Sequence, residues 1–346
     1  PRLQEVITEY FKVNNLEDYN EVLKAVAFLT YKHGKIDRVE SNNEYWLELD
    51  AKIREDFNIG GVKPSQLSLT KYKSRMKDVF RNAGARVVEG LSISNKEELA
   101  PTIETLGLPV IAKPDNGVGA NNTFKLLSKE DVEIFENQWN QDVVYFIESY
   151  VDNGILCTYD GLIDSKGEVV FDTSFYYTKP TLDLLNDSLD YGNIISKEID
   201  SKLKEYGRKI VKEFGMKERF FHIEFFKTED DYIAIEYNNR PAGAFAIDVY
   251  NYAHSYDFFK LYAEVVKGTN GELNLDSKYG LASTRRDYKD YLHSEDDIRN
   301  KYQDKLKAVL RMPEAFAELQ GNTMFVLVAD TLEEMNEMKE YVGKLR

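Results

Sequence analysis

Apolar and polar residues alternate on both sides of a polar turn near Asp230, within residues 220–238. Alternation with a period of two is typical of β-strands, and a short polar turn between two such segments predicts a β-hairpin. A turn centred at Asp230 places Glu224 opposite Glu236. Side chains then divide between two faces. We expect an apolar face with Ile223, Phe225, Ile233 and Ile235, and a polar face with His222, Glu224, Glu236, Asn238 and Arg240.

The spacing of apolar residues elsewhere predicts a mixture of helices and strands. Residues 1–65 are expected to be α/β in character, and strands and helices are expected to alternate over 85–150. A second hairpin is expected over 155–180. Residues 179–195 have little periodicity and several Asp and Asn residues, so we expect a surface loop there. Glycine-rich breaks predict three segments, namely 1–65, 66–270 and 271–346.

Composition narrows the possible functions. The chain has 346 residues, with 60 acidic against 45 basic residues and a formal net charge of −15. This balance argues against nucleic-acid binding by phosphate neutralisation and against docking on an anionic membrane. The single Cys157 excludes an internal disulfide, and four histidines do not form a zinc-like cluster. No membrane span or signal peptide is visible, so we expect a cytoplasmic protein.

The polar face of the hairpin carries the most informative chemistry. Glu224 and Glu236 directly across a β-ladder repel each other unless something neutralises them. A bound Mg²⁺ would do so, because it takes carboxylate and amide oxygens and shares substrate phosphates. Asn238 supplies a further oxygen, and Arg240 continues the face as a positive charge for phosphate. The alternative is a solvated sheet face on which Arg240 pairs with both glutamates.

Two other segments have features of a nucleotide site. A strand ends at Lys113 and leads into a loop with Gly117, Gly119 and Ala120, where backbone N–H groups can receive an anion. An ordinary turn would have the same composition. Further on, Glu148 stands where an apolar strand ends.

An adenine needs apolar walls and a few hydrogen bonds to its edge. Glu148 is expected to accept from the adenine amino group, and the backbone of Tyr150 or Val151 to bond the ring. The alternative is an exposed glutamate at a strand end.

In this order the segments resemble the ATP-grasp superfamily over about residues 65–270. Glu236-Tyr-Asn238-Asn-Arg240 is similar to its Glu-x-Asn-x-Arg signature, behind an upstream metal-ligand glutamate at Glu224. The flanking sequences 221–224 and 240–243 look most like the carboxylate–amine ligase branch, which includes amino-acid ligases and carnosine-synthase-like enzymes. Leu156 departs from that branch, where a glutamate usually contacts the ribose.

The resemblance implies an α/β (α+β) fold in which two α+β subdomains grip ATP. The lid would cover about residues 85–150 of an ATP-grasp domain at 66–270. Residues 271–346 would form a C-terminal α/β segment packed on it. Residues 1–65 would be the remnant of a preceding α/β domain, and the Pro1 start leads us to expect a truncated one.

The resemblance also implies an activity, an ATP- and magnesium-dependent ligase that joins a carboxylate to an amine through an acyl phosphate. The divalent ion would be Mg²⁺ or Mn²⁺. The substrates would be small molecules, without nucleic acid or membrane, and a homodimer is possible. The implied site comprises the catalytic Arg240, the nucleotide-binding Lys73, Lys113, Gly117, Gly119, Ala120, Glu148, Tyr150 and Val151, and the metal ligands Glu224, Glu236 and Asn238.

Two other readings remain open. One is a subunit that forms a carbamoyl or acyl phosphate within a larger synthase, and the other is a non-catalytic nucleotide-binding protein. Among the remaining residues, His222 is expected to be a hydrogen-bonded strand residue rather than a base. We expect Arg285 and Arg286 to form a surface pair, and Cys157 to be a small buried residue.

Overall fold

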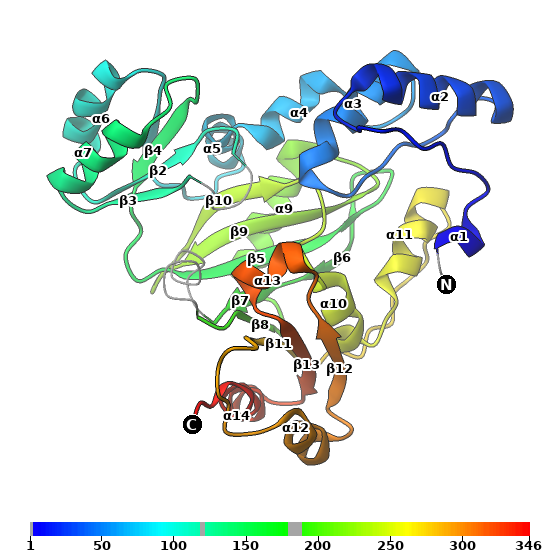
Figure 1. Cartoon of the computed structure of the whole chain (residues 1–346), viewed down its shortest axis with the longest axis vertical. Helices are drawn as coiled ribbons and strands as arrows, with labels where there is room; N and C mark the ends of the chain where they lie inside the picture. The colour runs from blue at the N-terminus through cyan, green and yellow to red at the C-terminus, as the bar shows by residue number, and fades with distance from the viewer. Residues whose placement is uncertain (1–2, 118–121, 179–188) are drawn as a thin grey trace. The chain divides into compact units, whose positions relative to one another are not determined.

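The computed structural model describes residues 3–117, 122–178 and 189–346 (Figure 1). The chain divides into two compact units, Pro1–Ser68 and Leu69–Arg346, which are described separately. No helix among the described residues is long and apolar enough to cross a membrane.

The first unit is helical. Its elements are α1 (Leu3–Val6), α2 (Tyr19–His33), the 3₁₀ turn η1 (Glu44–Trp46) and α3 (Leu47–Asp56), and α4 (Pro64–Lys71) runs across the division. The α/β character expected for residues 1–65 is therefore not seen in its described part, 3–65. Apolar residues recur there at helical spacing, and they form a small core of Val22, Val26, Ile53 and Ile59.

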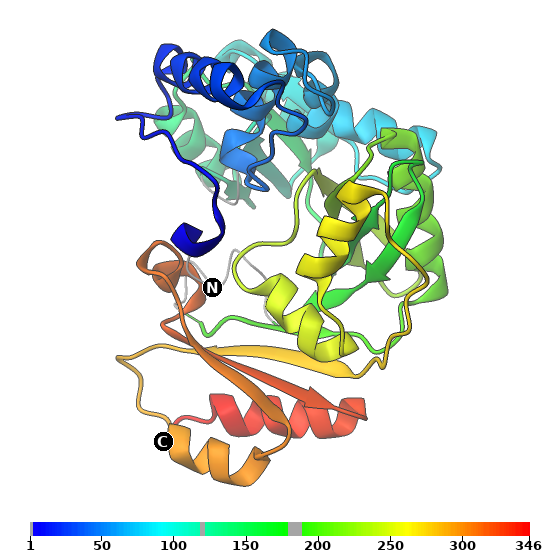
Figure 2. The ribbon, with the colours of Figure 1, turned by 90° about the vertical axis from the view of Figure 1, so that its right-hand side faces the viewer.

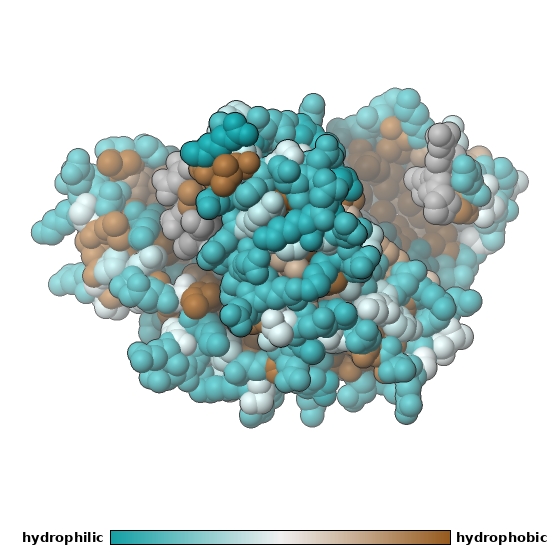
Figure 3. All heavy atoms as spheres, turned by 90° about the horizontal axis from the view of Figure 1, so that it is seen from below, coloured by the Kyte–Doolittle hydropathy of each residue, from teal (hydrophilic) through white to brown (hydrophobic). Residues whose placement is uncertain are grey.

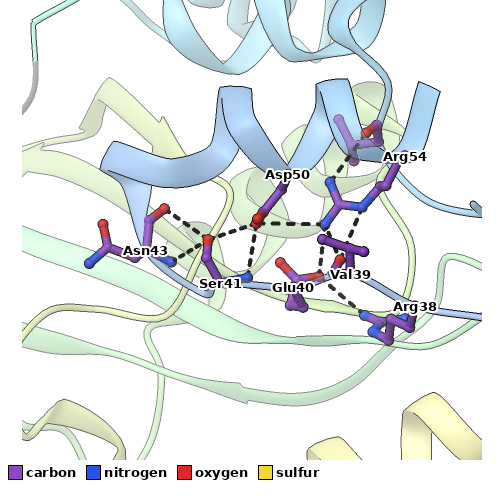
Figure 4. A network of polar contacts seen from close by, with 8 residues as sticks. Arg38, Val39, Glu40, Ser41, Asn43, Asp50 and Arg54 are labelled. Atoms are coloured by element: carbon purple, nitrogen blue, oxygen red, sulfur yellow. Dashed lines mark hydrogen bonds and ion pairs between the residues drawn. The ribbon is translucent and has the colours of Figure 1, made fainter. Parts of the chain in front are cut away.

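A buried guanidinium organises the loop before η1 (Figure 4). Arg54 is 2% exposed and donates to the carbonyl of Val39 at 2.6 and 3.1 Å and to the carbonyl of Val62 at 3.2 Å. Asp50, one helical turn earlier, accepts from the backbone N–H of Ser41 at 2.9 Å and from its hydroxyl at 2.7 Å. These bonds satisfy backbone groups of a loop that has no strand partner among the described residues.

The second unit contains two antiparallel sheets (Figure 1). The small sheet has the order β1-β4-β2-β3, and its core is shared with helices α6 and α7. Its elements, with the 3₁₀ turn η2 before α6, are β1 (Gly90–Ile93), η2 (Lys96–Glu98), α6 (Leu99–Leu106), β2 (Val110–Pro114), β3 (Phe124–Leu126), α7 (Lys129–Gln138) and β4 (Tyr145–Ser149).

The large sheet has nine strands among the described residues, in the order β10-β9-β5-β7-β8-β11-β13-β12, with β6 paired to β5. The strands are β5 (Ile155–Ile163), β6 (Val169–Thr173), β7 (Phe175–Tyr177), β8 (Gly192–Ile195), β9 (Arg219–Lys227), β10 (Tyr232–Asn238), β11 (Tyr279–Arg285), β12 (Leu306–Arg311) and β13 (Thr323–Ala329). Residues 271–346 thus contribute strands to the same sheet as the hairpin.

Helices cover both faces of the large sheet. The second unit also contains α5 (Lys73–Asn82), α9 (Ser201–Phe214), α10 (Ala246–His254), α11 (Phe258–Lys267), α12 (Glu295–Tyr302), α13 (Glu314–Gln320) and α14 (Leu332–Gly343). Helices α10 and α11 share a core with one face, whereas α12 and α14 pack on the other (Figure 2). The end that carries α12 and α14 presents mostly hydrophilic residues to the outside (Figure 3).

Helix α9 packs on the same face as α14, and one glycine permits its close approach. A Cβ at Gly207 would lie 2.1 Å from the Tyr159 ring of β5, so no larger residue fits there. The side chains of β5 that point away from α9 belong to the opposite face, which is also the polar face of the β9–β10 hairpin. We call the α9 side the back face and the other side the front face.

The register of the hairpin agrees with the alternation of its residues, with one difference. Glu224 lies opposite Glu236, as predicted. Asn238 lies opposite His222, also as predicted. A β-bulge between Ala234 and Glu236 shifts only the pairs nearer the turn by one residue, so Ile233 lies opposite Phe226 instead of sharing a face with Phe225. The predicted apolar face is therefore wrong at Ile233, because an extra residue in one strand inverts the alternation.

The surface loop predicted over 179–195 is wrong at its end. Residues 192–195 form β8, a buried strand between β7 and β11. This strand was not predicted because Gly192 and Asn193 have low β-propensity. Its position in the sheet interior, rather than the propensity of its residues, decides its structure. The remainder of that prediction, 179–188, lies outside the described residues.

Candidate functional site

The front face of the hairpin brings two carboxylates together. Glu224 and Glu236 are direct cross-strand neighbours. Glu236 forms an ion pair with Lys73 at 3.1 Å, and the Nε2 of His222 lies 3.5 Å from Glu224. In the absence of a metal, one lysine and one histidine therefore offset the repulsion between the two glutamates.

Lys73 comes from the first turn of α5 and is 3% exposed. Its ammonium also donates to the carbonyl of Gly117 at 2.8 Å. The turn before that glycine is held by Asp115, whose carboxylate accepts from the Ser74 backbone at 2.8 Å and from its hydroxyl at 2.7 Å. The start of the expected phosphate loop is thus fixed to the start of α5. Gly119 and Ala120 lie outside the described residues.

Asn238 and Arg240 continue the front face beyond the glutamates. Arg240 donates to the Asn238 side-chain oxygen at 3.3 Å and to the carbonyl of Pro241 at 2.9 Å. Burial raises the pKa of Glu224, but His222, Arg240 and Lys113 outweigh it and hold that pKa below its usual value. Arg240 is thus close enough to Glu224 to act on its carboxylate electrostatically.

The expected adenine residue Glu148 lies in a separate ion-pair cluster. Its two oxygens lie 2.5 Å from the ammonium of Lys113 and 2.9 Å from that of Lys77. Burial raises the pKa of Glu148, but the two lysines outweigh burial and lower it to about 2. Glu148, which we expected to accept from the adenine amino group, therefore binds a lysine with each oxygen, and it is buried rather than exposed.

Lys77 is a site residue that the sequence analysis did not identify. It lies one turn after Lys73 on α5 and is 1% exposed, and burial lowers its pKa. The helical spacing of four residues, which places both ammonium groups on one face, was the signal available in the sequence.

Tyr150 and Val151 follow β4, where a chain connection to the large sheet begins. The backbone N–H of Tyr150 donates to the carbonyl of Pro109 at 3.1 Å. Lys125 lies 4.3 Å from the centre of the Tyr150 ring. On β5, Leu156 lies on the front face, since it is two residues from Thr158, the partner of Glu224.

His222 is held by a buried network rather than being free at a strand edge. Its Nδ1 lies 2.5 Å from Asp160, which also accepts from the hydroxyls of Thr158 and Tyr250. Burial lowers the pKa of His222, but Asp160 and Glu224 outweigh it and raise the pKa to about 9. His222 is therefore a hydrogen-bonded strand residue, as expected, and its other nitrogen faces Glu224.

Three further residues that the sequence analysis considered lie outside the candidate site. The surface pair expected at Arg285 and Arg286 is wrong, because both residues are buried, Arg285 at the end of β11 and Arg286 just beyond it. Arg285 donates to the carbonyls of Val342 and His293, and Arg286 to those of Leu189 and Glu318.

Cys157 is buried as expected, and burial raises the pKa of its thiol to about 12.

The donor set suits a hard divalent cation without completing its coordination. Two carboxylates and one amide oxygen are ligands of the type that Mg²⁺ takes, and the carboxylates already face each other. The described residues contain no group of three or more His, Cys, Asp or Glu placed to hold a metal by themselves. The residues therefore fit a magnesium ion that draws its remaining ligands from phosphate and water.

Comparison with known proteins identifies related sequences. Residues 106–248 match the family model of the ATP-grasp domain. The chain is 30% identical over 112 residues to an L-arginine-specific L-amino acid ligase of Bacillus subtilis, covering 32% of this chain and 27% of that protein. It is 28% identical over 144 residues to D-alanine--D-alanine ligase B of Clostridium perfringens, covering 40% of this chain and 45% of that protein. The chain thus matches less than half the length of these relatives.

Solved structures share the fold over most of the chain. An L-amino acid ligase from Bacillus licheniformis has a TM-score of 0.72 at 14% identity, covering 95% of this chain and 84% of that one. An N5-carboxyaminoimidazole ribonucleotide synthetase in complex with ADP has a TM-score of 0.71 at 16% identity, covering 95% and 83%. At these identities the likeness concerns the fold.

Proposed function

We propose that this chain, which carries an ATP-grasp domain and has the ATP-grasp fold, is an ATP- and magnesium-dependent ligase that joins a carboxylate to an amine and releases ADP and phosphate. The observation that carries the proposal is the opposed pair Glu224 and Glu236 on the front face of the hairpin, with Asn238 and Arg240 beside it. The named ligases among the relatives support this choice of reaction.

In the proposed site, Glu224, Glu236 and Asn238 would hold magnesium, which would neutralise the charge of the β- and γ-phosphates. Lys73, 3.1 Å from Glu236, would exchange this carboxylate for a phosphate when Glu236 serves as a metal ligand. Its ammonium is then available to a phosphate oxygen. Binding of metal and nucleotide is thus an exchange of ionic partners, which keeps each buried charge compensated before and after.

The second cluster is proposed to bind the remainder of the nucleotide. Lys113 donates to a phosphate, while Lys77 keeps the charge of Glu148 compensated. The Glu148 oxygen released by Lys113 accepts from the adenine amino group, with backbone of Tyr150 or Val151 beside the ring. Gly117, with Gly119 and Ala120 beyond it, would cover the phosphates.

ATP supplies the phosphoryl group that converts the substrate carboxylate into an acyl phosphate, from which an amine displaces phosphate. Arg240 donates hydrogen bonds to the phosphoryl oxygens and to the oxyanion of the tetrahedral intermediate. His222 and its network fix the orientation of Glu224. The substrate is proposed to be a small carboxylate and the acceptor a small amine.

The test is ADP release from ATP and Mg²⁺ in the presence of a mixture of amino acids. The proposal requires ADP and phosphate to form in equal amounts and to depend on the added amino acids. Glu236→Gln should abolish this release, and Glu205→Gln, a substitution of an exposed glutamate on α9, should leave it unchanged. Nucleotide binding without any amino-acid-dependent ADP release would reject the ligase and leave the non-catalytic reading.

A further inference from the structure

A cavity of about 490 Å³ lies in the second unit, between the back face of the large sheet and the starts of α9 and α14. Its floor is formed by buried residues, among them Cys157, Leu203 and Tyr232. Its rim is formed by exposed ones, including Ile155 and Leu332. A volume of this size is within the usual range for small-molecule sites, which is about 300–1,000 Å³.

The cavity is distinct from the proposed nucleotide site. Cys157 contributes to it, whereas Leu156 and Thr158 point to the front face, the latter opposite Glu224. Successive residues of a strand point to opposite faces, so the sheet itself separates the two sites. A ligand in the cavity would not contact the front-face carboxylates.

The floor presents polar groups that no described residue satisfies. Ser174 is 4% exposed, and its hydroxyl makes no hydrogen bond with the described part of the chain. Tyr176, which is half-buried, lines the same cavity, and its hydroxyl likewise has no hydrogen-bond partner among the described residues. The two hydroxyls are therefore available to donate hydrogen bonds to a polar ligand, or to accept them from one.

The rim presents charges of both signs. Lys227 and Glu198 line the cavity, and neither forms an ion pair within 4.0 Å with any side chain in the described ranges. Asp200 also lines it, but its carboxylate accepts from the backbone N–H groups of Lys202 and Leu203 as the N-cap of α9. Lys227 and Glu198 therefore present one positive and one negative charge to the cavity, and they do not form an ion pair with each other.

We propose that this cavity binds a short zwitterionic peptide, about two residues long, with an apolar side chain. Its carboxylate would bind Lys227, its ammonium Glu198, and its peptide group the hydroxyls of Ser174 and Tyr176. Leu203 and Tyr232 would contact the side chain. A dipeptide separates its ammonium and carboxylate by ~3.8 Å more than a single amino acid does. Its two ends can therefore reach two rim charges that lie more than 4.0 Å apart.

The probe is L-alanyl-L-leucine, titrated calorimetrically into the full chain without nucleotide or metal. We expect saturable binding with one molecule per chain, and about tenfold or greater weakening for the N-acetylated and the C-amidated peptide, since each loses a charge-assisted hydrogen bond. Lys227→Met should weaken binding to a similar extent. Lys217→Met removes an exposed lysine that does not line the cavity and should leave binding unchanged.

The proposal is overturned by either of two results. The first is the absence of saturable binding, and the second is equal affinity for the blocked peptides or for Lys227→Met.

Discussion

Two carboxylate–lysine clusters on the front side of the second unit differ in how completely they are paired. Glu148 binds Lys113 at 2.5 Å and Lys77 at 2.9 Å, and all three side chains are less than 10% exposed. The hairpin glutamates have partners at 3.1 and 3.5 Å, and their side chains are 15% and 21% exposed. The first cluster has an excess of positive charge, and in the second two carboxylates lie on opposite residues of the ladder.

This difference in pairing indicates that the Glu148 cluster contributes mainly to stability, whereas the hairpin glutamates are suited to the proposed chemistry. A carboxylate between two lysines in a buried site is stabilised, and removing it leaves buried charges uncompensated. Two facing carboxylates with looser partners gain most from a divalent cation. We therefore expect substitutions in the Glu148 cluster to lower the free energy of unfolding, and substitutions in the hairpin to affect turnover more than stability.

The largest effect is expected at the hairpin. Glu236→Gln should lower ATP turnover by several orders of magnitude, because the metal loses a charged ligand. Its melting temperature should stay close to that of the wild type, since the substitution also relieves the repulsion with Glu224. Activity with saturating substrates and calorimetric melting check the two statements. Full activity in Glu236→Gln would exclude this glutamate as a metal ligand.

Substitutions at Arg240 and Lys113 should affect different steps, the chemical reaction for Arg240 and nucleotide binding for Lys113. Arg240→Ala should lower the rate at saturation by roughly 10²–10³, the usual loss for one oxyanion or phosphoryl contact. Lys113→Ala should mainly raise the dissociation constant of an ATP analogue, because its contact exists in the ground state. Titration of the analogue and ADP release measure both quantities. A variant at Arg240 that loses nucleotide affinity but keeps its rate would have a structural role only.

Alternation along the hairpin was sufficient to predict its central pair. The pairing of Glu224 with Glu236 follows from the distance of each residue from the turn, and no tertiary contact is needed to obtain it. The bulge near Ile235 could not be obtained in this way, because residues 232–235 are all apolar and their pattern does not show where the alternation shifts by one residue. The expected face of Ile233 was wrong for that reason.

Residues whose role depends on a distant partner were missed. Lys77 meets Glu148 across 71 positions of sequence, and Asp160 meets His222 across 62. No short sequence pattern marks either pair. The first forms when α5 packs near β4, and the second when β5 pairs with β9. The strand β8 was missed similarly, since its burial between β7 and β11 decides its structure.

Glu148→Gln should lower stability at pH 7 and have less effect in acid. Folding lowers the pKa of Glu148 from 4.5 to about 2, which corresponds to about 3 kcal/mol. Because the folded pKa is the lower one, this stabilisation is present above pH 4.5 and is lost as the pH falls toward 2. Urea unfolding at pH 7 and pH 3 measures it. A difference between wild type and variant that does not shrink on acidification would contradict the ion-pair assignment.

The smallest effect is expected for Lys73→Met. The Lys73 ammonium forms an ion pair with Glu236 at 3.1 Å and would compete with a metal for this carboxylate. Removing the ammonium should therefore raise the affinity for Mg²⁺ alone by a few-fold. The same variant should bind the ATP analogue more weakly, because a phosphate contact is lost. Lys71→Met, on α4, is the matched control. Unchanged metal affinity would mean that Lys73 and the metal do not compete.

Manganese binding tests the assignment of the two clusters most directly. Electron paramagnetic resonance measures the Mn²⁺ bound per chain in the presence of a non-hydrolysable ATP analogue, for the wild type, Glu236→Gln and Glu148→Gln. Our account predicts that Glu236→Gln loses most of the bound manganese, whereas Glu148→Gln, in the chain that remains folded, keeps it. Manganese binding that survives Glu236→Gln and disappears in folded Glu148→Gln would contradict the account, because it would place the metal at the other carboxylate.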